Sequence, residues 1–382
     1  MNNILKYASL LLAAAMLFAC DEKSGTDPVV EGGEFRILVD KDVIQSNGTD
    51  ASTLTVMLGD KDVTSESTIY DAENNVVTLN GGKFTTTENG EYKFWATYGT
   101  NSTFSKDAFD NGLITIKAIP VPVPAKAKDP QESNLSFKHR VFLVQSTGTA
   151  CKYCPGMVMI MRKAFDPAKM VLAAVHNFAA GDPAYLAQPS YGALGASGVP
   201  SVSIDFASVY GNYTDQKGLE DAISQRYNST EAKVGISVNS VIEGDYLVAR
   251  VSVKAAETGT YNVGAWLLED GIYGKQLDEY GIKAKDPDHN YDNHDNCTRI
   301  ADSRWNNSFV GFPLGEVEQG KTAEKTFVMN LKKDFKVENL HLAVFVTEAS
   351  DEAPGHRVSG KYYTMNNVID CPVGEEVTFE YK

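Results

Sequence analysis

The residues best able to do covalent chemistry are Cys151 and Cys154, two cysteines separated by two residues. The apolar run 140–145 before them has the length of a strand, and residues 157–165 after them favour a helix. Cys151 is therefore expected at or just before a helix N-terminus, where unpaired N–H groups and the helix dipole stabilise a thiolate. Cys154, one turn later on the same face, can resolve a mixed disulfide. The spacing predicts a thiol–disulfide exchange site.

Two other interpretations of the cysteine pair compete with exchange. A zinc site needs four ligands, and the sequence contains no second close pair of cysteines or histidines to complete one. A permanent local disulfide needs nothing further, so this alternative stays open.

A second feature lies downstream, where residues 198–205 open a β-branched strand with Pro200 at its start. A proline is tolerated at the first residue of a strand, and one fixed there is often cis. The cysteine pair and this proline together resemble the thioredoxin superfamily. The resemblance implies that Pro200 faces Cys151 and Cys154 and that the backbone of Val199 pairs with an extended peptide. An ordinary turn proline is the alternative.

The N-terminus carries one positive charge, at Lys6, followed by an apolar run over residues 7–19. This run is shorter than the roughly 20 residues that a membrane span requires. It ends in Leu-Phe-Ala-Cys at positions 17–20, which resembles the lipobox of bacterial lipoproteins. The resemblance implies cleavage before Cys20, lipid attachment to it, and an outer-membrane anchor facing the periplasm or the cell surface. An uncleaved apolar segment with an accidental cysteine is the alternative.

Two cysteines, Cys297 and Cys371, remain after the motif and the lipid site are assigned. An even remainder in an exported protein favours a disulfide between them. Such a bridge would close a loop of 74 residues and stabilise the fold by roughly 4 kcal/mol. Two buried thiols are the alternative.

The 382 residues are enough for two or three hydrophobic cores. The expected segments are a signal peptide (1–19), a polar tether (20–34), an immunoglobulin-like β-sandwich (35–118), a proline-rich linker (119–135), a thioredoxin-like domain (136–231) and a C-terminal β-sandwich (232–382). Short strands divided by Asn-Gly turns mark the sandwiches, and alternating strand and helix patterns mark the central domain. We therefore expect a multidomain α+β protein with a central α/β domain.

This order of segments resembles the outer-membrane-protein-28-related lipoprotein family, with the immunoglobulin-like module as an addition. The resemblance covers about residue 136 to the C-terminus, and Cys151, Cys154 and Pro155 match its redox-like motif. Because members of this family have no settled activity, the resemblance implies location and architecture more than a reaction.

An acidic loop over residues 286–297 holds four carboxylates and two imidazoles within ten residues. Asp288, His289, Asp292 and His294 are weak candidate ligands for calcium or a transition metal. The loop lacks the glycine and the closing glutamate of an EF-hand, and a flexible solvated loop is the alternative. No cofactor is expected, and a net charge of −15 argues against nucleic-acid binding.

Two functions are compatible with these features. The first is an extracytoplasmic thiol–disulfide oxidoreductase or isomerase, in which Cys151 attacks a disulfide of a protein or peptide and Cys154 resolves the intermediate. Against it, Thr149 and Ala150 stand where many active members have aromatic and acidic neighbours. The second is a surface binding or adhesion lipoprotein in which the cysteine pair is a structural disulfide.

Overall fold

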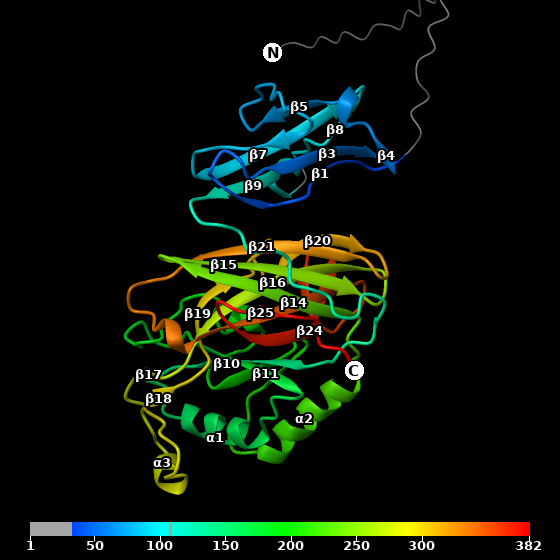
Figure 1. Cartoon of the computed structure of the whole chain (residues 1–382). Coiled ribbons are helices and arrows are strands. Elements are labelled where there is room, and N and C mark those ends of the chain that lie inside the picture. The colour runs from blue at the N-terminus through cyan, green and yellow to red at the C-terminus, as the bar shows by residue number, and fades with distance from the viewer. Residues whose placement is uncertain (1–32, 107–108) are drawn as a thin grey trace, which may run out of the picture.

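The computed structural model describes residues 33–106 and 109–382 (Figure 1). Strands dominate this part of the chain, which also holds three α-helices. The predicted signal peptide, the lipidation site Cys20 and most of the tether lie outside the described residues. None of the helices in the described ranges is long and apolar enough to cross a membrane.

The N-terminal module packs two sheets face to face. Its strands are β1 (Phe35–Val39), β2 (Val43–Gln45), β3 (Ser52–Leu58), β4 (Lys61–Asp62), β5 (Thr68–Asp71), β6 (Lys83–Phe84), β7 (Gly90–Tyr98), β8 (Asn101–Ser102) and β9 (Ile114–Ile119). One sheet has the order β1-β3-β4 with β6 beside β3, and the other has the order β2-β9-β7-β5 with β8 beside β7. Alternate residues of the strands fill the space between the sheets, among them Ile44, Leu54 and Ile116.

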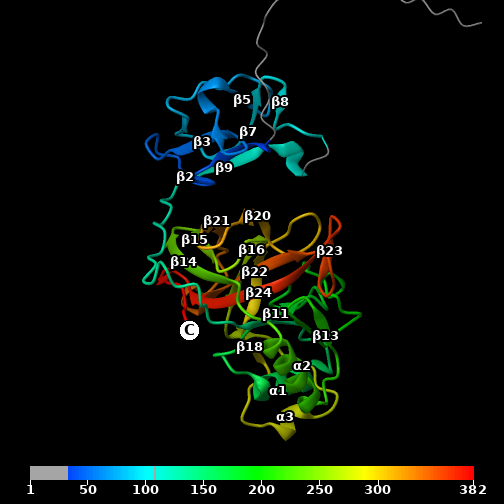
Figure 2. The same cartoon turned by 90° about the vertical axis from the view of Figure 1, so that its right-hand side faces the viewer.

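The proline-rich segment after β9 runs along the rest of the protein (Figures 1 and 2). Val121 packs against Val248 in a small apolar cluster. Lys254 is 2% exposed, and its ammonium lies 2.8 Å from the Asp129 carboxylate. It also donates to the carbonyls of Gln131 and Glu132. The sequence predicts an extended, semi-rigid rod here, and these contacts attach part of that rod to the C-terminal strands.

The central segment combines four strands with two helices. These are β10 (Val141–Thr147), α1 (Cys154–Ala164), β11 (Met170–His176), β12 (Ser201–Ile204), β13 (Ser208–Tyr210) and α2 (Gln216–Asn228). The strand order is β13-β12-β10-β11, with β11 parallel to β10 and the other pairs antiparallel. Val141 and Leu143 of β10 pack against both helices, whereas Phe142 and Val144 point to the opposite face. This alternation places α1 and α2 on one face of the sheet.

The remaining strands form a sandwich that shares a sheet with the central segment. They are β14 (Val234–Glu243), β15 (Tyr246–Ala255), β16 (Gly259–Glu269), β19 (Cys297–Asp302), β20 (Phe312–Val317), β21 (Thr322–Asn330), β22 (Leu340–Ser350), β23 (His356–Val358), β24 (Lys361–Pro372) and β25 (Glu376–Val377). β11 pairs with β19 in parallel at Ala174 and Cys297, so a ten-stranded sheet runs from β13 to β23. The second sheet, β21-β15-β14-β25, packs against the part of the ten-stranded sheet formed by β16, β22 and β24. The ten-stranded sheet contains strands from both sides of the boundary expected at residue 231.

A long insertion between β16 and β19 leaves the sandwich and reaches the helices of the central segment (Figures 1 and 2). It contains β17 (Ile272–Tyr273), α3 (Ile282–Lys285) and β18 (Asn293–His294). Arg162 of α1 pairs with Asp286 of this insertion at 3.5 Å.

His341 on β22 lies between two carboxylates. Its Nδ1 is 2.6 Å from Asp370, and its Nε2 is 3.5 Å from Asp270. Burial lowers the pKa of this imidazole, but the two carboxylates outweigh burial and raise the pKa to about 9. Because the folded pKa exceeds the unfolded value of about 6.5, the stabilisation is complete below pH 6.5 and is lost as the pH rises through 9.

We expect the free energy of unfolding to fall by about 1–2 kcal/mol across this window, since the half-exposed carboxylates are partly screened by water. Denaturant titrations at pH 6, 7.5 and 9 measure the change. The variant His341→Gln should show a flatter profile, and an equally steep profile in that variant would contradict the assignment.

Candidate functional site

The two motif cysteines form a disulfide at the start of α1. Cys154 is the first residue of the helix, and Pro155 follows within its first turn. The Cys154 N–H donates to the Cys151 carbonyl, and the Cys151 N–H donates to the Gly148 carbonyl. These bonds form a tight turn between β10 and α1. The turn places Cys151 just before the helix N-terminus, as the sequence predicts.

This disulfide is buried, with Cys151 3% and Cys154 0% exposed. Residues 274–280 of the insertion, which we call the strap, lie against the loop that carries the cysteines. The Leu277 N–H donates to the Thr149 carbonyl at 2.9 Å, and the Glu279 N–H donates to the Lys152 carbonyl at 3.0 Å. The strap thus pairs through its backbone with the loop that carries the cysteines.

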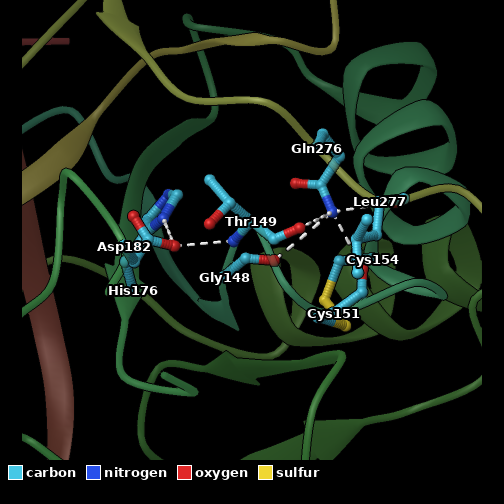
Figure 3. The surroundings of a disulfide bond; sticks show 8 residues. All are labelled: Gly148, Thr149, Cys151, Cys154, His176, Asp182, Gln276 and Leu277. Atoms are coloured by element: carbon cyan, nitrogen blue, oxygen red, sulfur yellow. Dashed lines mark hydrogen bonds and ion pairs between the residues drawn. A yellow bond between two sulfur atoms is a disulfide. The ribbon is translucent and has the colours of Figure 1, made fainter. Parts of the chain in front are cut away.

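Gln276 is a buried side chain that holds the strap to the cysteine loop (Figure 3). Its Nε2 lies 3.3 Å from the Gly148 carbonyl, 3.1 Å from the Thr149 carbonyl and 2.8 Å from the Cys151 carbonyl. An amide has two N–H groups, so they are shared among these oxygens. One buried amide therefore satisfies the carbonyls of the turn that precedes α1.

A hollow beside the disulfide is lined by Val199, Pro200 and three tyrosines. Tyr153, which lies between the two cysteines, has its ring centroid 5.6 Å from that of Tyr213 and 5.4 Å from that of Tyr280. The Val199–Pro200 peptide bond is cis. The structure therefore brings the predicted Val199 and Pro200 to the same hollow as the cysteine turn, and Tyr280 comes to it from the far end of the strap.

A buried hydrogen-bond chain supports the cysteine loop from its other side (Figure 3). The Asp182 carboxylate accepts from the Thr149 N–H at 2.6 Å and lies 2.9 Å from Nδ1 of His176. Burial alone would raise the pKa of Asp182, but these hydrogen bonds hold it well below its usual range. His176 is thus a hydrogen-bonded scaffold residue, and its carboxylate partner positions the loop.

The Cys297 thiol lies 3.6 Å from Nε2 of His176. Burial, reinforced by the nearby carboxylate of Asp182, raises the pKa of this thiol well above its usual value. The sulfur therefore stays protonated at neutral pH, and the contact is a buried hydrogen bond rather than a thiolate–imidazolium pair.

The predicted disulfide between Cys297 and Cys371 is wrong, because both residues are free, buried thiols. Cys297 lies on β19 and Cys371 on β24, with β16 and β22 between them in the sheet. Three strand spacings separate the backbones by about 14 Å. A disulfide requires Cα atoms within about 6.8 Å of each other. The Cys371 thiol instead donates to the Leu342 carbonyl.

The acidic loop does not gather its candidate ligands. Asp292 accepts from the Gln276 N–H and from the Lys283 ammonium, and His294 is 3.0 Å from the Gly274 carbonyl. His289 packs edge-on against Tyr291. Across residues 33–106 and 109–382, no three His, Cys, Asp or Glu side chains are grouped as a metal ion would require, Asp288 included. Asp292 and His294 instead bond to the strap.

Residues 187–359 match the family described as outer membrane protein Omp28. The chain therefore carries an Omp28 family domain over this range, which includes Val199, Pro200 and the strap. The match begins after Cys154, so the disulfide lies outside it.

Comparison with solved structures finds distant likenesses. Protein AGR_C_4864 from Agrobacterium tumefaciens is 15% identical, with a TM-score of 0.40 over 65% of this chain and 100% of that chain. A DUF3823 family protein from Bacteroides ovatus is 10% identical, with a TM-score of 0.18 over 88% of this chain and 97% of the other. Likenesses this weak carry no argument about fold or function. No curated protein matches the chain.

Proposed function

We propose that this protein is an outer-membrane-anchored lipoprotein whose thioredoxin-like unit exchanges disulfides with extracytoplasmic proteins through Cys151 and Cys154. The observation that carries the proposal is the disulfide at the start of α1, beside a hollow lined by Val199 and Pro200. The match to the Omp28 family over residues 187–359 supports the location. Lipid attachment at Cys20 supplies the anchor.

The arrangement of strands supports a thioredoxin-like unit. A parallel β10–α1–β11 crossover is followed by two antiparallel strands and α2, and both helices pack on one face of the sheet. The cysteine pair sits where the first strand passes into the first helix. In the same proposal, the two packed sheets of residues 35–119 are an immunoglobulin-like spacer.

The bonded pair would act as an oxidant. A substrate thiolate attacks Sγ of Cys151, a substrate–Cys151 bond forms, and the Cys151–Cys154 bond breaks with its electron pair on the Cys154 sulfur. A second substrate thiolate then attacks the substrate sulfur of the mixed disulfide and releases Cys151. The substrate leaves with a disulfide, and the pair becomes a dithiol that holds the two protons lost by the substrate. The hollow beside Pro200 would hold the substrate chain during these steps.

The burial of the pair favours a second candidate function. With both sulfurs buried, Cys151–Cys154 can serve as a permanent clip that fixes the turn before α1. The protein would then be a surface binding lipoprotein in which this unit is a scaffold.

The reduction potential of the pair separates the two functions. The full-length protein is equilibrated with glutathione or dithiothreitol buffers, and free thiols are trapped and counted. The variant Cys151→Ser/Cys154→Ser corrects for Cys297 and Cys371. We expect a potential between roughly −120 and −270 mV, the span of exchange catalysts. A potential below about −300 mV would mark a structural disulfide and overturn the exchange function.

A further inference from the structure

A cavity that is open at its rim lies between α1, the sheet and the insertion. Its volume is about 100 Å³. Alternate residues of β10 and β11 point to the helix face, so Gln145, Leu172 and Ala174 form its floor. Val158 and Met161 of α1 form one wall, and His294 with the neighbouring residues of the insertion forms another. We call this space the α1 cavity.

The amide nitrogen of Gln145 is buried without a hydrogen-bond partner and faces this cavity. The residue is 4% exposed, and its Nε2 has no partner in the part of the chain that the structure describes. A buried N–H donor without a partner lowers the free energy of unfolding by about 1–3 kcal/mol. Most buried polar atoms in native proteins therefore have a hydrogen-bond partner. The amide lines the α1 cavity, where a bound molecule would satisfy it.

The charges around the cavity favour a neutral occupant. Burial and the neighbouring His176 lower the pKa of His294, and burial lowers the pKa of His289, so both rings are neutral near pH 7. Of the two charged residues in the lining, Arg162 is already paired with Asp286, and the Asp295 carboxylate accepts from the Gly271 N–H. Apolar side chains of Val158, Met161, Leu172 and Ala174 make up much of the remaining surface.

We propose that the α1 cavity binds a small, flat, mostly apolar molecule that carries one neutral amide-like group, with Gln145 as the residue that recognises this group. An amide both donates and accepts, so it matches a partner that does the same. An enclosed apolar cavity of about 150 Å³ holds benzene; the α1 cavity is smaller, at about 100 Å³, but is open at its rim, so a single-ring molecule would fill it and extend to the rim. The proposal does not depend on disulfide exchange, since none of these groups touches the sulfurs.

Three probes of one shape test this assignment on the full-length protein: benzamide, benzoate and toluene. Titrations followed by ligand-observed NMR give a dissociation constant for each. We expect benzamide to bind about tenfold more tightly than benzoate or toluene, because one net hydrogen-bond pair is worth about a factor of ten. The variant Gln145→Met keeps the volume and removes the amide, so it should weaken benzamide about tenfold and leave toluene unchanged.

Two further variants keep the test decisive if Gln145→Met folds poorly. Val158→Phe adds bulk from a half-buried helix position and should abolish the binding of benzamide. Gln225→Met, on the exposed face of α2, should change nothing. Equal affinity for benzamide and toluene would overturn the role of Gln145. The absence of binding by every probe, or full binding to Val158→Phe, would overturn the site and leave a cavity that holds only water.

Discussion

Replacing Gln276 by alanine is expected to speed the reduction of the Cys151–Cys154 disulfide about 10- to 100-fold. Because the sulfurs are buried, we expect a reductant to reach them when the strap opens, so that the rate follows the population of the open form. The Gln276 amide donates to the carbonyls of Gly148, Thr149 and Cys151. Each carbonyl keeps a backbone donor in the variant, but the closed form loses the two hydrogen bonds that the amide N–H groups supply, which destabilises it by about 1.5–3 kcal/mol. Each 1.4 kcal/mol is about tenfold in population.

The rate is measured by quenching a dithiothreitol reaction at intervals and trapping the freed thiols. Leu277→Ala is the matched control on the same strap, since Leu277 is 51% exposed and pairs through its backbone. It should reduce at nearly the wild-type rate. If Gln276→Ala also reduced at that rate, the strap would not be the barrier to the disulfide.

Replacing Asp205 by alanine is expected to lower the free energy of unfolding by about 3–5 kcal/mol, the cost of leaving a buried charge without its partner. The fully buried carboxylate accepts from the Phe142 N–H at 2.7 Å and from Nε of Arg226 at 2.7 Å. Arg226 also donates to the Met365 carbonyl. One carboxylate thus joins β10, α2 and β24, and alanine would leave the guanidinium and the Phe142 N–H without it.

Denaturant titrations followed by circular dichroism measure this loss. They are run at pH 8, because burial raises the pKa of Asp205 to about 6 and the carboxyl must be ionised. Asp221→Ala, which removes an exposed partner of Lys217 on α2, is the control and should cost less than about 0.5 kcal/mol. A loss of similar size in both variants would show that the burial of Asp205 carries no special stability.

Local patterns were sufficient to predict the elements around the cysteines. The apolar run at 140–145, the helix after Cys154 and the strand after Pro200 all appear in the structure. Each of these elements is determined by residues close to it in the sequence, and hydrophobic periodicity detects such local patterns. Residues 75–79 are an apolar run of strand type that forms no strand, because the Asn75 N–H donates to the Asp71 carboxylate in a turn and Val76 makes only an isolated bridge.

The contacts of the strap could not be predicted in the same way. Gln276 lies in an irregular stretch whose composition resembles any polar loop, and its partners are about 125 residues earlier in the chain. The histidines and aspartates of the insertion were interpreted as weak metal ligands, yet Asp292 and His294 bond to the strap. A single sequence carries no signal for such long-range hydrogen bonds, since they depend on where the sheet places each strand.

The Cys297–Cys371 prediction was wrong for a related reason. An even number of remaining cysteines in an exported protein favours a disulfide. The count does not say how many strands lie between the two residues in the sheet. Once β19 joins β11 and β24 lies three strands away, the two thiols are held apart by the sheet itself.

The distance along the chain between the cysteines and the strap also orders events in time. Synthesis proceeds from the N-terminus, so the turn with Cys151 and Cys154 is complete about 125 residues before Gln276 is made. Such a contact has high sequence separation and closes late in folding. A disulfide that forms before residues 274–280 join the fold therefore forms without the strap beside it. In this order of events, the disulfide forms first and the strap docks beside it afterwards.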